Sequence, residues 1–130
     1  MKKSETVRGR GSFGRILKQG RRLDGSLCRC YFMCEELPPP PLRVGVAVLG
    51  PRRTASERNR IKRRLRESFR LERAALDGAL AASGVSVSLI LAFKGNRFPE
   101  TGRIPFESYR ADVRGVLRML LPHLEQWQKS

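Results

Sequence analysis

The sequence predicts a small α+β protein in which helices and a sheet form a two-layer sandwich. The chain has 130 residues, which suits one domain with one core. Two early segments alternate apolar and other residues, as strands do. A long helical pattern, a continuous apolar run and a second helical pattern follow. This order of three helices and three strands favours helices packed on one sheet.

The N-terminal region predicts a short helix after a flexible segment. Residues 1–11 are basic and rich in glycine, so we expect them to be mobile. Ser12 is a suitable N-cap, and Phe13, Ile16 and Leu17 form one apolar stripe. Gly20 is expected to end this helix.

Residues 28–34 predict the first strand. Cys28, Cys30, Phe32 and Cys34 fall on one face, and Arg29, Tyr31 and Met33 fall on the other. Alternate cysteines on a strand lie about 6.5–7 Å apart, which is poor geometry for a disulfide. The single histidine, His123, is remote in sequence, so a zinc site is not favoured. We therefore expect reduced, partly buried cysteines in a cytoplasmic protein.

The second strand is expected over residues 42–49, after a rigid connection at Pro38–Pro41. Its apolar face holds Leu42, Val44, Val46 and Val48. Its other face is made shallow by Gly45 and Ala47. Gly50 and Pro51 end the strand.

The rest of the chain predicts a long helix, a central strand and a last helix. The long helix starts near Ala55 or Ser56 and runs to about Leu80, and its glutamates Glu67 and Glu72 are expected to form i,i+4 ion pairs. The strand at 85–93 is continuously apolar in its last five residues, which is typical of a central strand. The last helix starts near Phe106 and is expected to stop at Pro122, leaving 123–130 as a tail.

Charge is the most informative feature for function. There are 27 Lys and Arg against 12 Asp and Glu, a formal charge of +15. Such an excess indicates a polyanionic partner. An acidic membrane surface is less favoured, because no basic segment also has an exposed apolar face. No run is long enough to span a membrane, and no signal peptide is recognisable.

The charge is concentrated on the long helix. Ile61, Leu65 and Phe69 recur every four residues and are expected to dock the helix on the core. A second flank of the same helix presents cations and one amide: Asn59, Lys62, Arg63, Arg66, Arg70 and Arg73. Arginine grips phosphate oxygens with two parallel donors, so this flank predicts contact with a nucleic-acid backbone.

No catalytic constellation is recognisable. The acidic residues are scattered, and no serine, histidine and aspartate form a nucleophilic arrangement. The sequence therefore predicts a binding protein without a catalytic centre of its own. Phe13 and Tyr31 lie near basic residues and are candidates to stack on bases, with core packing as the alternative for Phe13.

Residues 58–70 closely resemble the signature helix of the bacterial ribonuclease P protein subunit. Further similarities follow in order along roughly Arg8 to Pro122: Phe13, Ile16 and Gly20 in a first helix, Tyr31 on an early strand, residues 43–46 on the next strand, and Asp112, Leu117, Leu120 and Leu121 in a last helix. This resemblance implies a four-stranded sheet with a left-handed βαβ crossover, which general topology rules disfavour.

The resemblance also implies function. The ribonuclease P holoenzyme cuts precursor tRNA to leave the mature 5′ end, with hydrolysis and magnesium on its large RNA. The expected partners are thus the catalytic RNA and precursor tRNA, without a cofactor on the protein, a membrane or a small-molecule substrate. Carried over by position, contacts to the catalytic RNA fall on Arg58, Asn59, Arg60, Lys62, Arg63, Arg66 and Arg70. The cleft for the 5′ leader would hold Phe13, Leu17, Arg29 and Tyr31.

The chain departs from the family pattern in two places. The family carries a Ser-Lys-Lys stretch after the second strand, where this chain has Leu49, Gly50 and Pro51. Arg52 and Arg53 are expected to supply charge slightly later. Leu17 stands where the family often has a second aromatic.

Two other classes compete with this interpretation. A ribosomal-type protein would bind structured RNA without an enzymatic partner. A leucine-zipper DNA binder needs apolar heptads after its basic region. Steps of seven from Leu65 give Glu72 and Ala79, so the zipper is disfavoured.

Overall fold

The computed structural model describes residues 10–35, 42–50, 53–95 and 104–129. The predictions for residues 1–9 and for Pro38–Pro41 fall outside them. The first helix already includes residues 10–12, so the predicted N-cap at Ser12 is wrong. Eight elements occur in the described part: α1 (Arg10–Gln19), β1 (Arg21–Asp24), β2 (Cys28–Glu35), β3 (Leu42–Leu49), α2 (Ala55–Glu72), α3 (Ala74–Ser83), β4 (Ser86–Lys94) and α4 (Phe106–Lys129).

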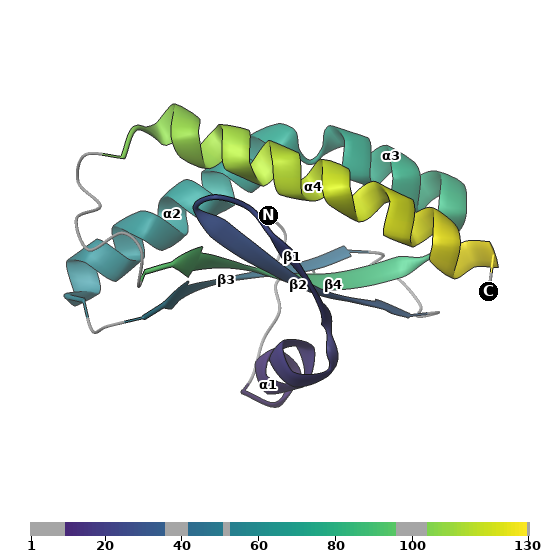
Figure 1. The fold of residues 1–130 in the computed structure, drawn as a ribbon, viewed down its shortest axis with the longest axis horizontal. Coiled ribbons are helices and arrows are strands. Elements are labelled where there is room, and N and C mark those ends of the chain that lie inside the picture. The colour runs from purple at the N-terminus through teal and green to yellow at the C-terminus, as the bar shows by residue number, and fades with distance from the viewer. Residues whose placement is uncertain (1–9, 36–41, 51–52, 96–103, 130) are drawn as a thin grey trace.

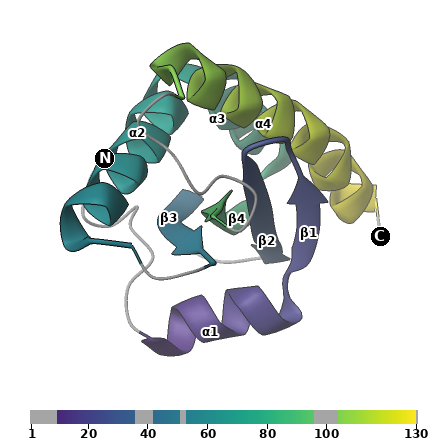
Figure 2. The same cartoon turned by 60° about the vertical axis from the view of Figure 1, so that its left-hand side comes forward.

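The strands form one mixed sheet in the order β1-β2-β4-β3. The pairs β1–β2 and β2–β4 are antiparallel, whereas β3 and β4 are parallel and joined through α2 and α3. Helices α2, α3 and α4 cover one face of the sheet, and α1 lies on the other (Figures 1 and 2). The predicted α+β fold and the four-stranded sheet are confirmed, as is the central place of β4.

The main core lies between the sheet and the three helices above it. Alternate residues of β2 and β3 enter this core, including Cys30, Phe32, Val44 and Val46. Their neighbours on the opposite face, Tyr31, Met33 and Ala47, pack around a smaller cluster of Ile16 and Ile90 beneath α1. The predicted assignment of residues to the two faces of β2 and β3 is therefore confirmed.

The prediction of one long helix to Leu80 is wrong, and the described part holds four helices instead of three. The helix divides at Arg73. Helix α3 ends at Ser83, and the next residue, Gly84, caps it in a left-handed conformation and donates its backbone N–H to the carbonyl of Leu80. Ion pairs accompany the division. Glu72 binds α4 through Arg110, whereas Arg73 binds Asp77 and lies over the ring of Phe69. The predicted i,i+4 pair for Glu72 is thus wrong, and Glu67 pairs with Arg70 at i+3.

The last helix does not stop at Pro122, because α4 continues to Lys129. An internal proline removes one helical hydrogen bond and costs about 3 kcal/mol. Leu120 and Leu124, on either side of it, are both buried in the core. Their burial offsets that cost, since a buried leucine contributes about 1.5–3 kcal/mol.

Strand β1 was not predicted from the residues, because it is short and largely polar. Its turn into β2 is tied to α4 by Asp112, whose carboxylate accepts hydrogen bonds from the backbone N–H groups of Ser26, Leu27 and Cys28 at 2.6–3.1 Å. A side chain at Gly25 would meet that carboxylate at 2.6 Å. The hairpin therefore depends on one carboxylate and one glycine.

The three cysteines are free thiols. Cys28 and Cys30 are fully buried. Burial raises the pKa of the Cys30 thiol to about 12 and also raises that of Cys28. These thiols therefore stay protonated and pack as small apolar groups.

In the described part of the chain, no helix is both long enough and apolar enough to cross a membrane.

Candidate nucleic-acid interface

Helix α2 begins where the sequence predicts. Thr54 is its N-cap, and the Thr54 hydroxyl accepts a hydrogen bond from the backbone N–H of Glu57 at 3.2 Å. Such a cap stabilises a helix by about 0.5–2 kcal/mol. The predicted docking stripe of Ile61, Leu65 and Phe69 is fully buried. Docking fixes the rotation of the helix and so decides which cations face solvent.

One flank of α2 presents Arg58, Lys62 and Arg66, each four residues from the next. Arg58 and Arg66 are exposed and Lys62 is half-buried between them. Desolvation, followed by the positive charges of Arg58 and Arg66, lowers the pKa of Lys62. We call these three residues the α2 cation row. Like charges held this close repel one another, and a phosphate beside them would relieve that repulsion.

Further predicted residues extend the row around the outer side of α2. Asn59, Arg63 and Arg70 are exposed. Arg70 is already ion-paired with Glu67. The structure therefore brings Asn59 and Arg63 beside the row and places Arg70 at the far end of the helix.

Arg60 lies on the opposite flank, toward α4, and is half-buried. Its neighbour Arg64 lies over the ring of Tyr109 at 5.7 Å and donates to the carbonyl of Ile104 at 3.3 Å. Burial raises the pKa of Tyr109, against the opposing effect of Arg64 and Arg60. Arg60 is thus separated from the cation row by the width of the helix.

Arg53 does not replace the missing lysines of the family pattern, and that expectation is wrong. Its guanidinium donates to the carbonyl of Gly95 at 2.8 Å, pairs with Glu57 and lies over the ring of Phe93. Its side chain is 5% exposed. Arg53 instead fixes the start of α2 to the end of β4. Arg52 lies outside the described residues.

The second set of predicted residues meets on the α1 face of the sheet. Tyr31, Ile90 and Gly45 are aligned across β2, β4 and β3. Phe13 and Tyr31 are half-buried against the Ile16–Ile90 cluster, while Leu17 is 38% exposed. Both aromatic rings therefore support α1 and also retain surface toward solvent.

Arg29 is held next to Tyr31 on this face. Its guanidinium donates to Asp24 at 2.8 Å and to the hydroxyl of Tyr31 at 3.5 Å. Arg22 and Lys94 also lie 3.3 Å from the Asp24 carboxylate. One acidic group thus faces three cations, so the end of the sheet near Tyr31 stays positive.

Chemically, this arrangement binds anions. Among the residues that the structure describes, no group of three or more His, Cys, Asp or Glu is placed to hold a metal ion. Two conspicuous carboxylates, Glu72 and Asp112, are occupied by arginines and by backbone N–H groups. A basic helix with a mixed aromatic and cationic sheet face defines a small RNA-binding α+β protein.

Comparison with known proteins identifies the family. The family model described as ribonuclease P matches residues 1–119. A ribonuclease P protein component from Chlorobaculum tepidum is 35% identical over 132 residues, covering 92% of this chain and 81% of the relative. The chain therefore belongs to the ribonuclease P protein family, which acts in tRNA processing. This assignment does not favour the ribosomal-type alternative.

Solved structures agree in fold. The ribonuclease P protein from Thermotoga maritima gives a TM-score of 0.69 at 23% identity, covering 88% of this chain and 96% of that one. A Staphylococcus aureus ribonuclease P protein mutant, described as defective in mRNA degradation activity, gives a TM-score of 0.63 at 19% identity. The match covers 90% of this chain and 88% of that one. At these identities the likeness supports the fold alone.

Proposed function

We propose that this protein assists an RNA subunit that carries out the hydrolysis, and that together they remove the 5′ leader from precursor tRNA. One observation carries this proposal. The protein has two separate surfaces that can bind anions, whereas its conspicuous carboxylates, Glu72 and Asp112, are used in contacts that stabilise the fold. Helix α2 offers its cation row, and the sheet offers Tyr31 among cations. A protein of this kind can hold two RNA segments at once and leave the chemistry to one of them.

The α2 cation row is proposed to bind the catalytic RNA. Arg58, Lys62 and Arg66 lie along about 12 Å of helix at 1.5 Å per residue. Cations at this spacing reach successive phosphates of a structured RNA, and Asn59 and Arg63 extend the contact. Arg60 and Arg70 are proposed as secondary contacts, because Arg60 lies on the opposite flank near Tyr109 and Arg70 is ion-paired with Glu67.

The α1 face of the sheet is proposed to bind the leader. Bases stack on aromatic rings with a gain of about 1–3 kcal/mol each, independently of sequence. Tyr31 offers a ring that Arg29 fixes through its hydroxyl. Gly45 and Ala47 keep the adjacent part of β3 shallow, so a single strand can lie there. Phe13 and Leu17 are proposed to contact it from α1.

Magnesium ions are proposed to act on the RNA subunit, where phosphates provide the oxygen ligands that Mg²⁺ prefers. The protein's part is electrostatic. Its cations lower the repulsion between the catalytic RNA and precursor tRNA, which magnesium must otherwise screen.

The test is cleavage of a precursor tRNA by the matching catalytic RNA at low magnesium, with and without the protein. We expect little cleavage by the RNA alone and a clear increase on adding the protein. Protein without RNA is the essential control, because the described S. aureus variant links a relative to mRNA degradation. Metal-dependent cleavage by highly purified protein alone would contradict the proposed division of labour.

A further inference from the structure

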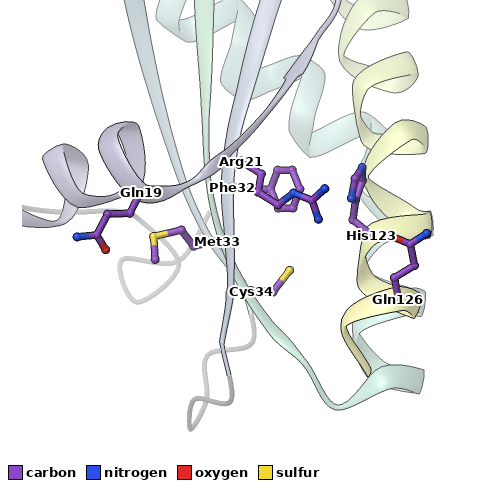
Figure 3. A pocket seen from close by; sticks show the side chains of 7 residues that line it. All are labelled: Gln19, Arg21, Phe32, Met33, Cys34, His123 and Gln126. Carbon is purple, nitrogen blue, oxygen red and sulfur yellow. The ribbon is translucent and has the colours of Figure 1, made fainter. Parts of the chain in front are cut away.

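A cavity of about 400 Å³ lies at the edge of the sheet, remote from α2. Its lining comes from α1, β1, β2 and α4: Gln19, Arg21, Phe32, Met33, Cys34, His123 and Gln126. Figure 3 shows Arg21, Phe32 and Cys34 on the side of β2 that faces α4, with Gln19 and Met33 on the other side. The cavity therefore reaches around the sheet edge from one face to the other.

The cavity exists because β1 is shorter than β2. Pairing between these strands ends at Arg21 and Phe32. Beyond this point, β1 offers no partner to Met33 or Cys34. The last turns of α4, which continue past Pro122, close the other side.

The lining has the chemistry of a nucleotide site. His123 presents an aromatic ring, which packs against Phe32 with centroids 5.3 Å apart. Gln19 and Gln126 carry primary amides, which both donate and accept hydrogen bonds as base edges do. Arg21 supplies a cation for a phosphate. The lining includes no acidic residue, in contrast to the cavity beside the β1–β2 turn, where Asp24 and Asp112 occur.

Two further observations favour occupancy by a ligand. The Nδ1 atom of His123 is buried and has no hydrogen-bond partner among the residues that the structure describes. Such an atom costs free energy unless a partner is supplied. The volume also falls within the usual range for small-ligand sites, about 300–1,000 Å³.

The position of the cavity indicates which RNA would enter it. Met33 lines the cavity and also packs against the Ile16–Ile90 cluster next to Tyr31. Met33 and Tyr31 are two residues apart on one strand face, about 6.5–7 Å. A single strand that stacks on Tyr31 can therefore continue past Met33 into the cavity. Helix α2, which carries the cation row, lies on the β3 side of the sheet, away from the β1 edge where the cavity opens (Figure 2).

We infer that this cavity is a further nucleotide subsite for the 5′ leader, in which His123 contacts the base, Gln126 its edge and Arg21 the phosphate. The inference rests on the proposed function, because it extends the leader path beyond Tyr31. The cavity would add contacts to the edge of a base, whereas the rest of the leader path offers only aromatic stacking and positive charge.

The test measures holoenzyme affinity for precursor tRNAs whose leaders are shortened one nucleotide at a time. Arg21→Ala and Gln126→Glu are the test variants, since both residues are exposed and their replacement spares the core. Arg118→Ala removes the same charge from an exposed position of α4 outside the cavity and serves as the matched control. Melting curves check the fold of each variant.

We expect both test variants to lose roughly 5- to 150-fold of the affinity that the distal leader nucleotides add, the range for losing a polar contact to a base edge or a phosphate. Affinity for the shortest leaders should not change, and Arg118→Ala should behave as wild type. If the variants match wild type at every length while Tyr31→Ala does not, the subsite is refuted and leader binding stands. If leader length has no effect on wild type, leader binding itself fails, and the subsite with it. If the variants instead weaken affinity for the catalytic RNA, the leader assignment is overturned.

Discussion

Glu72 at the end of α2 accepts a hydrogen bond from Arg110 of α4 at 2.7 Å, and it also binds Arg114 one turn further along. The Glu72 side chain is only 10% exposed. This carboxylate connects the basic helix to the helix that closes the core. It also offsets part of the positive charge of Arg110 and Arg114 on α4.

Glu72→Gln is expected to destabilise the fold by about 1.5–3 kcal/mol at neutral pH, the range for hydrogen bonds to charged groups. The lower end applies, because the Arg110 and Arg114 side chains are 33% and 41% exposed and solvent screens the pairs. The measurement is chemical denaturation of the wild-type protein and of Glu72→Gln.

The contacts of Glu72 with Arg110 and Arg114 also predict that the stability of the protein depends on pH. Hydrogen bonds from Arg114 and Arg110 lower the pKa of Glu72 to about 2 from an ordinary value of 4.5. A carboxyl with a lowered pKa in the folded state stabilises the protein above pH 4.5 and loses this contribution as the pH falls toward 2. The stability difference between wild type and Glu72→Gln should therefore shrink over that window. A constant difference would exclude the pair as its source.

Gly95→Ala is expected to destabilise the protein by about 1–3 kcal/mol or more, as overpacking does. A Cβ there would lie 1.9 Å from the carbonyl oxygen of Leu49, and the Gly95 carbonyl accepts from Arg53. Gly78→Ala is the matched control. Among the described residues, no atom beyond the adjoining backbone of α3 lies within 4 Å of a Cβ at Gly78, so this substitution should raise stability by about 0.5–1 kcal/mol. Equal effects in melting experiments would contradict this account.

Tyr31→Ala is expected to weaken binding of precursor tRNA far more than binding of mature tRNA, by about 1–3 kcal/mol. Mature tRNA has no leader to stack on the ring. Because Tyr31 also packs under α1, some loss of thermal stability is expected, and the ratio of the two affinities is the decisive quantity. Tyr31→Phe keeps the ring and should retain most of that ratio. Equal weakening for both RNAs would assign Tyr31 to packing alone.

Periodicity was sufficient to predict most of the fold. The face assignments of β2 and β3 and the buried stripe of α2 follow from spacings of two and four residues. The features of the fold that were not predicted depend on contacts between residues far apart in the sequence. The division at Arg73 accompanies ion pairs to α4, and α4 continues past Pro122 because Leu124 reaches the core. Neither partner is recognisable from local sequence.

Part of the candidate nucleic-acid interface could also be predicted from the sequence. Spacing alone separates Lys62, Arg63 and Arg66 from the docking stripe, whereas Arg58 was predicted as a contact only through the family resemblance. It could not show that Arg53 is engaged by Gly95 from a distant strand, or that Arg64 lies over Tyr109. The cavity around His123 was missed entirely, since it depends on the start of β1 lying near the last turns of α4.

Leu65→Ala should separate folding from binding on α2. Leu65 is fully buried, so its truncation is expected to cost about 2–5 kcal/mol of stability. Lys62→Ala, on the solvent side of the same helix, should leave the melting temperature nearly unchanged. Thermal denaturation of both variants checks this, and a large loss in Lys62→Ala would show that the row serves the fold.

The central claim is that the α2 cation row binds the catalytic RNA, and the salt dependence of that affinity tests it most directly. Removing one cation that binds a phosphate should reduce the slope of log affinity against log salt by about 0.7–0.9. We expect Arg58→Ala and Lys62→Ala each to show this reduction with an intact fold, and Arg118→Ala to keep the wild-type slope. An unchanged slope in both row variants, or the same reduction in Arg118→Ala, would contradict the claim.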